Sequence, residues 1–337
     1  MKTIVYIGNK GNSKSSSNLS SIDVLGPLLG KSGYTIFSAS QRQNIILRLL
    51  EMLWVCFKNR KKANYVIIDT YSTLNFYYAY IVSQFCRILK LKYIPILHGG
   101  NLPERLKTAP KLSKYIFKNA FVNVAPSLYM KSNFEALGYN NIINIPNSIE
   151  LENYTFKERN FDSVNLLWVR SFSEIYNPLL AIKVLKALKE KNIKAKLCMV
   201  GPDSNGGLQE ARDFAKKLNV DVRFTGKLSK QEWAKLSEDY NIFINTTNFD
   251  NMPVSVIEAM ALGLPVVSTN VGGIPFLIDN KVNGLLVNPN SINEFLDAIN
   301  SLIKDQTKTN KIIKQARVSA ERFDWKAVEK LWIKVLE

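Results

Sequence analysis

Residues 248–268 read NFDNMPVSVIEAMALGLPVVS, and this stretch predicts a loop, a largely buried helix and a strand in close succession. Asn251 can cap the helix, and Pro253 suits its first turn. Gly263 then ends the helix, and Pro265 opens the strand. Because the first amides of a helix have no partner within it, the start of this helix is a ready anion-binding position.

Short apolar runs alternate with longer periodic segments over the whole chain of 337 residues. Helices between such runs are typical of βαβ units and parallel sheets. The sequence therefore predicts an α/β protein with two doubly wound halves, which agrees with the domain count expected for this length. The expected strands lie near 3–8, 34–38, 65–69, 93–97, 121–125 and 142–145 in the first half, and near 164–169, 195–200, 221–225, 241–245, 265–268 and 284–287 in the second.

The boundary between the halves falls near residues 147–162, where a polar and charged stretch precedes an apolar run. We expect one Rossmann-like domain over residues 1–150 and a second over 160–322, with the C-terminal helix 323–337 completing the first. Ligands of open α/β sheets bind outside the carboxyl ends of the strands, so a cleft between the two domains is the expected site. The apolar face of the C-terminal helix predicts packing and consists of Trp325, Val328, Leu331, Trp332, Val335 and Leu336.

The formal net charge of +17 is divided unequally. Residues 1–150 hold 19 Lys and Arg against 6 Asp and Glu, a balance of +13, whereas residues 151–337 hold the remaining +4. The basic excess therefore indicates an anionic partner that is met by the first half. A content of 46% apolar and 11% aromatic residues argues against intrinsic disorder.

The three cysteines stand singly in apolar runs without a CxxC pair, so neither a disulfide framework nor a zinc site is expected. No DxD sequence and no cluster of His, Asp and Glu has metal-ligand spacing, so we expect no metal cofactor. The first eight residues are too strand-like for a signal peptide, and no run of 18 apolar residues occurs. We therefore expect a cytoplasmic protein.

Two carboxylates belong to the loop and helix of residues 248–268. Asp250 lies just before the predicted helix start, and Glu258 is about one and a half turns inside the helix. Each taken alone is explained by an ordinary cap or a solvated helix residue. Glu258, however, is flanked by apolar residues in a helix that is expected to be buried, and a buried carboxylate needs partners.

Residues 250–273, DNMPVSVIEAMALGLPVVSTNVGG, closely resemble the donor-binding motif of the retaining glycosyltransferase family 4, which has the GT-B fold. In that family two glutamates bracket seven residues, the first near the transferred sugar and the second on the nucleotide ribose. The resemblance implies that Glu258 binds ribose hydroxyls and that Asp250, which replaces the first glutamate, contacts the sugar. The second half would then be the domain that binds a nucleotide-sugar donor, and the first half the acceptor side.

Further donor contacts are implied by the same resemblance. Asn251, Met252 and Pro253 would line the sugar and phosphates, and the amides of Val254 and Ser255 would bind the phosphates. Gly272-Gly273 is expected to form a turn, whose family counterpart stands near the donor site.

A basic residue follows the first predicted strand of the second half. Arg170 matches the arginine of a family pattern that clamps the diphosphate, and a forked guanidinium suits that role. The lysine and glycine of the pattern are replaced near Asn177-Pro178, so Lys227 is a candidate substitute. An arginine in an ordinary surface loop is the alternative interpretation of Arg170.

The only histidine, His98, follows an apolar strand and precedes Gly99 and Gly100, which allow a close approach of the backbone to a ligand. A lone histidine is more often structural, but family members have a histidine on a loop here that touches the transferred sugar. The resemblance therefore implies a catalytic role for His98. A neutral imidazole could hydrogen-bond a sugar hydroxyl.

The glycine-rich loop after the first strand contains Gly8, Lys10 and Gly11 and is neither a GxGxxG motif nor a P-loop. An acceptor or phosphate contact and a plain flexible loop are equally compatible with it.

Residues 42–62 are apolar on one helical face and carry basic residues around and after it. A helix facing the core explains the apolar residues. The alternative is an interfacial helix whose basic residues contact anionic lipid, with Trp54 at the boundary.

The sequence as a whole predicts a metal-independent retaining glycosyltransferase that acts on a glycan or lipid-linked acceptor in bacterial surface polysaccharide biosynthesis. It would be cytoplasmic and peripheral on the inner face of the plasma membrane, with no nucleic-acid partner. A nucleotide-sugar epimerase of similar shape would instead consume donor without an acceptor. A basic nucleic-acid-binding α/β protein would explain the charge, but no aromatic RNA platform or recognition helix is evident.

Overall fold

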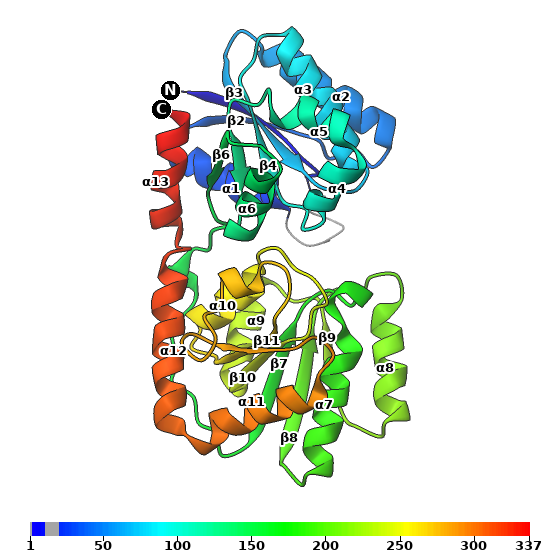
Figure 1. Ribbon diagram of the computed structural model, residues 1–337, viewed down its shortest axis with the longest axis vertical. Coiled ribbons are helices and arrows are strands. Elements are labelled where there is room, and N and C mark those ends of the chain that lie inside the picture. Colours follow the sequence, from blue (N-terminus) through cyan, green and yellow to red (C-terminus); the bar gives the residue numbers. More distant parts are fainter. Residues whose placement is uncertain (1, 11–19) are drawn as a thin grey trace. The chain divides into compact units, whose positions relative to one another are not determined.

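The computed structural model describes residues 2–10 and 20–337, which form two compact units (Figure 1). The first unit consists of residues 1–147 and 328–337, and the second of residues 148–327. Each unit is built around one parallel sheet.

In the described part of the first unit, the sheet has six strands in the order β2-β1-β3-β4-β5-β6. This order places the ends of β1, β3 and β4 side by side at the carboxyl edge of the sheet. Pairing in register sets Asp69 of β3 beside Ile96 of β4. The strands are β1 (Thr3–Ile7), β2 (Thr35–Ala39), β3 (Ala63–Thr70), β4 (Tyr93–Leu97), β5 (Asn123–Ala125) and β6 (Ile142–Asn144).

Helices cover both faces of this sheet because alternate side chains of each strand point to opposite sides. Val5 and Ile7 pack with helices α2 and α3, whereas Tyr6 meets α1, whose Gly26 lies against its ring. The helices of this unit before its C-terminal segment are α1 (Ser21–Lys31), α2 (Ile45–Asn59), α3 (Asn75–Ile88), α4 (Leu102–Thr108), α5 (Pro110–Phe117) and α6 (Leu128–Ala136).

The second unit contains a parallel sheet of six strands in the order β12-β11-β10-β7-β8-β9, all within the described residues. Its central strand β7 contributes Leu166 and Trp168 to the core on one face and Leu167 to the core on the other. The strands are β7 (Val164–Val169), β8 (Ala195–Val200), β9 (Arg223–Gly226), β10 (Ile242–Asn245), β11 (Val266–Thr269) and β12 (Leu285–Val287).

The helices of the second unit divide between its two cores. Residues of α7, α8 and α11 pack on the core of Leu166 and Trp168, and residues of α9 and α10 on that of Leu167. Helix α12 contributes to both. The α-helices are α7 (Pro178–Glu190), α8 (Gly207–Lys217), α9 (Lys230–Leu236), α10 (Val254–Ala261), α11 (Ile292–Lys304) and α12 (Gln306–Glu321).

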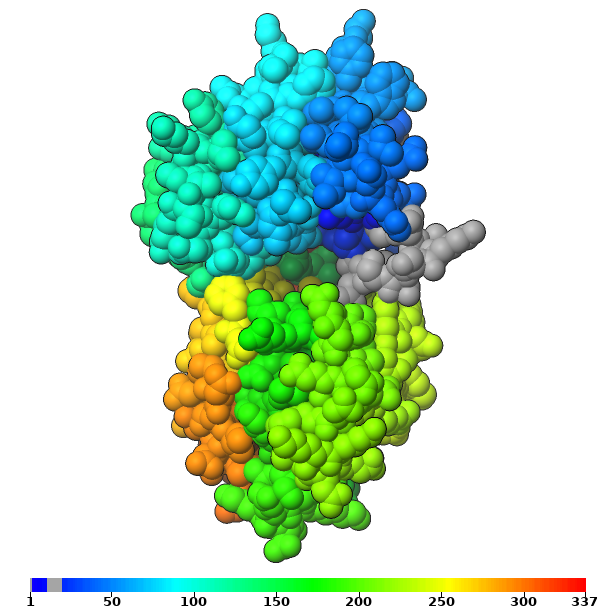
Figure 2. Space-filling view, turned by 90° about the vertical axis from the view of Figure 1, so that its right-hand side faces the viewer, coloured from blue at the N-terminus to red at the C-terminus, as the bar shows by residue number. Residues whose placement is uncertain are grey.

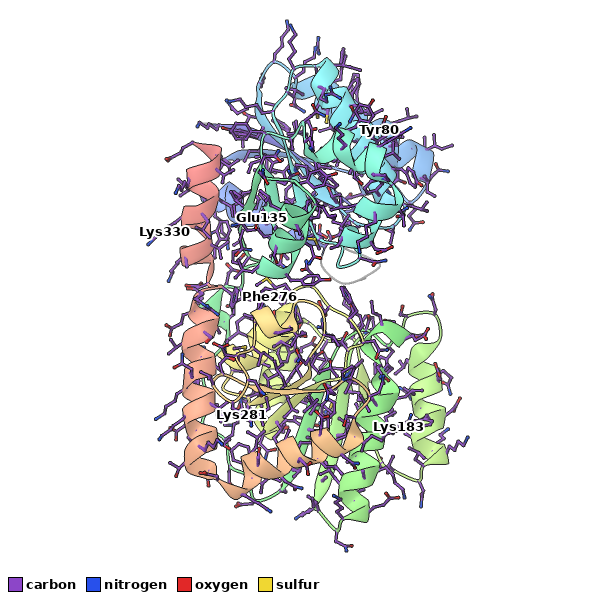
Figure 3. The ribbon with its side chains drawn as sticks, in the orientation of Figure 1. Tyr80, Glu135, Lys183, Phe276, Lys281 and Lys330 are labelled. Atoms are coloured by element: carbon purple, nitrogen blue, oxygen red, sulfur yellow. The ribbon has the colours of Figure 1, made fainter. Side chains whose placement is uncertain are left out.

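The last helix, α13 (Trp325–Leu336), belongs to the first unit from Val328 onward, together with the final residue Glu337. Its Val328, Trp332 and Leu336 are buried, and the exposed Lys330 points away from the protein (Figure 3). Lys2 Nζ donates hydrogen bonds to the carbonyl oxygens of Leu336 and Glu337 at 2.8 and 2.7 Å. The N-terminal strand and this helix are thus fastened together.

Each of the twelve predicted strands coincides with an observed one to within a few residues, and the prediction of two parallel-sheet halves is confirmed. The predicted packing face of α13 was wrong at Leu331, which is 41% exposed. None of the helices in the described ranges combines the length and apolar character needed to cross a membrane.

Candidate functional site

Helix α10 begins at Val254, immediately after the loop that follows β10. Pro253 is its N-cap residue, so the prediction that Asn251 caps the helix was wrong: the helix starts two residues later than that cap requires. Gly263 adopts φ +77 just after the C-cap Leu262, as expected for a glycine that ends a helix. The start of α10 therefore lies at the carboxyl edge of the second sheet.

The first turn of α10 offers donors to an anion. The amides of Val254 and Ser255 precede the first intrahelical hydrogen bond, which runs from the amide of Val256 to the carbonyl of Pro253. Among the described residues, the buried Oγ of Ser255 has no hydrogen-bond partner. Such an orphaned hydroxyl beside free amides fits a ligand oxygen at this position.

Glu258 is 4% exposed and is held by two groups that the sequence did not predict. Tyr154 donates its hydroxyl hydrogen to Oε1 at 2.6 Å, and Lys230 Nζ lies 2.9 Å from the same oxygen. Burial and then the Glu258 carboxylate raise the pKa of Tyr154 well above its ordinary value, so this hydroxyl stays a donor. The expectation that the carboxylate is buried and partnered is confirmed.

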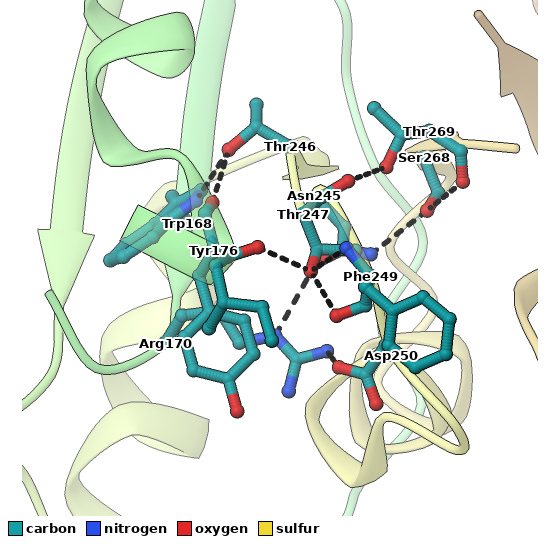
Figure 4. A network of polar contacts seen from close by, with 11 residues as sticks. Trp168, Arg170, Tyr176, Asn245, Thr246, Thr247, Phe249, Asp250, Ser268 and Thr269 are labelled. Carbon is teal, nitrogen blue, oxygen red and sulfur yellow. Dashed lines mark hydrogen bonds and ion pairs between the residues drawn. The ribbon is translucent and has the colours of Figure 1, made fainter. Parts of the chain in front are cut away.

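Arg170 and Asp250 meet in a direct ion pair beside the start of α10 (Figure 4). The pair joins Arg170 Nη2 to Asp250 Oδ2, while Arg170 Nε donates to Asn245 Oδ1 at 3.3 Å. The guanidinium also lies over the Tyr176 ring, 4.8 Å from its centroid. Nη1 takes part in neither polar contact, so its N–H groups can donate hydrogen bonds to a further anion. Arg170 is thus placed at a strand end and is not a plain surface arginine.

Buried hydroxyl groups hold the loop between β10 and α10 in shape (Figure 4). Thr246 Oγ1 accepts a hydrogen bond from Trp168 Nε1 at 3.0 Å. Thr247 Oγ1 donates to the carbonyl of Phe249, and Thr269 Oγ1 donates to the carbonyl of Thr247 at 2.6 Å. These bonds fix the backbone that carries Asp250.

Gly272 and Gly273 do more than form the predicted turn. The amide of Gly273 donates to the carbonyl of Asp250 at 2.8 Å. A Cβ on Gly273 would overlap the carbonyl oxygen of Asn251, and one on Gly272 would overlap that of Asp250. The two glycines therefore let the chain after β11 press directly against the loop before α10.

In the first unit, His98 forms a pair with Asp69. His98 follows β4, Asp69 lies near the end of the adjacent β3, and His98 Nε2 is 2.8 Å from Asp69 Oδ1. Tyr6 donates its hydroxyl hydrogen to the same oxygen at 3.0 Å. Burial and then the Asp69 carboxylate raise the pKa of Tyr6 well above its ordinary value. A carboxylate that accepts the Nε2 hydrogen leaves Nδ1 as the acceptor of the neutral ring.

The surroundings of this pair fix its geometry. The ring of Tyr71 stacks on His98 with centroids 5.3 Å apart. Gly8 packs against the Asp69 carboxyl group, and Gly99 packs against the backbone of Tyr71 and the following residue. The side chain of Asp69 is 1% exposed, and among the described residues its Oδ2 has no hydrogen-bond partner.

The structure distributes the other predicted site residues unevenly. Met252 is buried in the core of the second unit, so its side chain packs there. Lys227 is exposed after β9, and Lys230 is the lysine that reaches Glu258. Lys10 Nζ donates to Ser38 Oγ at 3.1 Å. Gly100 belongs to the turn that leads into α4, and the predicted contact at Gly11 lies outside the described residues.

The sequence patterns did not predict three residues that take part in these contacts, namely Asp69, Tyr154 and Lys230. Asp69 gave one signal: it is a single carboxylate that ends a strand of apolar residues. Within residues 2–10 and 20–337, no group of three or more His, Cys, Asp or Glu side chains is placed to hold a metal ion.

Residues 153–319 match the family described as glycosyl transferases group 1. This match lies in the second unit and takes in 167 of the 337 residues. Over 151 residues the chain is 28% identical to the sulfoquinovosyl transferase SQD2 of Arabidopsis thaliana, a match that covers 44% of this chain and 29% of SQD2. The chain thus matches less than half the length of such curated relatives.

Solved structures resemble the chain over its whole length. Sucrose-phosphate synthase from Thermosynechococcus elongatus aligns with a TM-score of 0.80 at 17% identity and covers 99% of both chains. The Anabaena protein HepE, solved with UDP-glucose, aligns with a TM-score of 0.79 at 18% identity, covering 100% of this chain and 99% of HepE. The fold is therefore GT-B, as the sequence predicted.

Proposed function

We propose that this protein is a retaining glycosyltransferase that moves a sugar from a nucleotide-diphosphate sugar to a hydroxyl of a glycan or lipid-linked saccharide. The observation that carries the proposal is the carboxyl edge of the second sheet. There the helix start of α10 and its buried glutamate lie beside a forked arginine that follows β7 and pairs with Asp250. Bacterial surface polysaccharide, such as capsule, O-antigen or exopolysaccharide, is the proposed product.

The donor roles follow from the chemistry of each group. Glu258 is the ribose contact, because a carboxylate accepts hydrogen bonds from two vicinal hydroxyls, and its orientation is set by Tyr154 and Lys230. The start of α10 and Arg170 bind the diphosphate. HepE has been solved with UDP-glucose, which supports a nucleotide sugar as the donor class.

Asp250 and His98 are proposed to contact sugar hydroxyls. The Arg170 guanidinium has five N–H donors, so it can bind Asp250 and the diphosphate of the donor at the same time. His98 presents Nδ1 as an acceptor, because Nε2 faces Asp69. These two assignments concern contacts, and neither residue is proposed to form a covalent intermediate.

The configuration of the anomeric carbon is proposed to be retained because the acceptor attacks the sugar from its front face, the side that the diphosphate leaves. The bond between the anomeric carbon and the diphosphate oxygen breaks as the acceptor oxygen bonds to the same face. The acceptor proton passes to the leaving phosphate oxygen. Negative charge grows on the diphosphate during this step, so Arg170 and the amides of Val254 and Ser255 stabilise the transition state. These protein donors are proposed to replace a metal ion.

The proposed location is the cytoplasm, on the inner face of the plasma membrane, and the proposed acceptor is linked to a polyprenyl diphosphate. The basic first half supports both proposals, because positive charge is attracted to anionic lipids and to a diphosphate.

A melting-temperature screen over UDP-, GDP- and ADP-sugars tests the donor class. A ligand that binds only the folded state raises the melting temperature, by an amount that grows with its concentration over its Kd. We expect one nucleotide series to do so, and product analysis to find sugar transferred with retained configuration, also in the presence of EDTA. Absence of any shift would contradict the donor assignment, and donor consumed without acceptor would indicate an epimerase.

Glu258→Gln is expected to weaken nucleoside-diphosphate binding about 10- to 100-fold, because a charged acceptor of ribose hydrogen bonds is lost. Isothermal titration gives the two Kd values. The matched control is Glu321→Gln, an exposed glutamate at the end of α12, which should bind as the parent does. A change in Kd of less than about threefold in a folded Glu258→Gln protein would remove Glu258 from the ribose site.

A further inference from the structure

One face of helix α2 is apolar and uncovered. The opposite face of this helix, with Met52 and Cys56, fills the core of the first unit. Of the two interpretations of residues 42–62, a helix facing the core therefore does not hold for most of the apolar face. Leu49 and Leu53 are partly buried at the margin. The exposed side chains recur at helical spacing and are Leu47 (52% exposed), Leu50 (55%), Trp54 (59%) and Phe57 (41%), joined by Ile45 and Ile46.

A second apolar stripe belongs to the neighbouring helix α3. Met52 and Cys56 of α2 share one core with Val82 of α3, and the Tyr78 hydroxyl of α3 donates to the carbonyl of Ile45 at the start of α2. Figure 2 shows them, blue and cyan, on one face of the first unit. Exposed apolar residues of this second stripe are Leu74, Tyr77, Ile81 and Ile88. We call the two stripes together the α2–α3 face.

The part of the chain that carries the α2–α3 face is basic. Residues 42–134 contain fifteen Lys and Arg against three acidic residues, which are Glu51, Glu104 and the buried Asp69. Arg60 lies over the Phe57 ring, 3.9 Å from its centroid, so the basic rim adjoins the apolar stripe directly. A symmetric pair of chains meeting through this face would bring the two basic rims together, which is unfavourable. An anionic surface with an apolar interior complements the face.

We propose that the α2–α3 face lies in the interface of an anionic lipid bilayer, with Trp54 inserted among the lipids. The start of α2 adjoins the carboxyl edge of the first sheet, because Arg48 Nη1 donates to Asn9 Oδ1 in the loop after β1. His98 lies at this same edge. A saccharide carried on a lipid diphosphate in that bilayer would reach this edge without leaving the membrane. This acceptor assignment rests on the proposed glycosyltransferase function, but the lipid contact does not.

Trp54 makes the inference directly measurable. All five tryptophans lie within the described residues, and Trp168, Trp233, Trp325 and Trp332 are buried. Fluorescence changes on adding vesicles therefore report on Trp54. We expect vesicles of phosphatidylcholine containing phosphatidylglycerol, at about 0.15 M salt, to bind the protein, shift its emission to the blue and allow quenching by brominated lipid. Trp54→Phe should still bind but lose the shift.

Leu50→Ser/Trp54→Ser is expected to lower vesicle partitioning about tenfold or more. The matched control, Val282→Ser/Val318→Ser, removes two exposed apolar side chains from the second unit and should partition as the parent does. Melting curves establish that both proteins are folded. Equal binding to pure phosphatidylcholine would overturn the anionic requirement. Binding of the parent without a blue shift would overturn the insertion of Trp54. If the parent instead forms a dimer in solution and Leu50→Ser/Trp54→Ser is monomeric, the face would be a contact with a second copy of the chain.

The same proteins separate this inference from the proposed function. Leu50→Ser/Trp54→Ser should keep the parent's melting shift with nucleotide sugar, because the substitutions lie in the other unit from Glu258. Vesicle binding by a protein that responds to no nucleotide sugar would contradict the enzyme assignment alone. A nucleotide response without vesicle binding would contradict the lipid contact alone.

Discussion

Gly273→Ala is expected to lower transfer from a nucleotide sugar about a hundredfold or more. The added Cβ would overlap the carbonyl oxygen of Asn251, which is backbone and has no flexible end that can swing away. The loop before α10 must then move, and with it Asp250 and the Arg170 guanidinium. A displacement of about 1 Å in a positioning element costs on the order of a hundredfold in rate. Initial rates at varied donor concentration measure the effect.

The control for this substitution is Gly30→Ala. Gly30 lies within helix α1, and a Cβ there meets no atom within 4 Å, so the same chemical change should leave the rate unaltered. The backbone of Gly273, with φ −84, is itself compatible with alanine, so the comparison isolates the contact with Asn251. A folded Gly273→Ala enzyme with the parent's donor affinity and rate would show that this loop does not position the donor site.

Asp69→Asn is expected to lower kcat about 10- to 100-fold with little change in nucleotide affinity. The carboxylate accepts hydrogen bonds from both Tyr6 and His98 through Oδ1, and a neutral amide holds the Nε2 hydrogen of His98 less strongly. The amide would also place a donor at the buried Oδ2 position, where the described residues offer no partner. We therefore expect Asp69 to act as a positioning residue that orients the His98 ring through Nε2.

Double substitution distinguishes positioning from independent action. If Asp69 works through His98, Asp69→Asn should add little to His98→Ala, because the ring it orients is already gone. Asp297→Asn, an exposed aspartate of α11, is the matched control. If the fold-losses in kcat of the two single substitutions multiply in the double variant, Asp69 acts independently of His98. If Asp69→Asn lowers only the melting temperature and leaves kcat unchanged, the role of Asp69 is structural.

Much of the fold could be predicted because its strands are short β-branched and aromatic runs between helical segments, a pattern that depends on local sequence. The helix at residues 254–261 could be predicted from local sequence in the same way, because Pro253 and Gly263 mark its two ends. The pairings within the sites could not be predicted in this way. Arg170 and Asp250 are 80 residues apart, and His98 meets Asp69 only through the register of β3 and β4.

The exposure of α2 shows a different limit. Helical periodicity identifies the apolar face of a helix, but it does not say whether another element covers that face. In this chain Met52 and Cys56 on the opposite side already fill the available core. Leu50 and Trp54 are left outside, although the sequence pattern alone is typical of a core helix.

The division of the first unit into residues 1–147 and 328–337 has a consequence for synthesis on the ribosome. The unit that is translated first cannot complete its packing until the segment from residue 328 has been made. The second unit is continuous in the chain and can finish folding earlier. A nascent chain arrested shortly after the second unit has emerged should therefore already respond to nucleotide, while the first sheet still lacks the helix that Lys2 fastens to it.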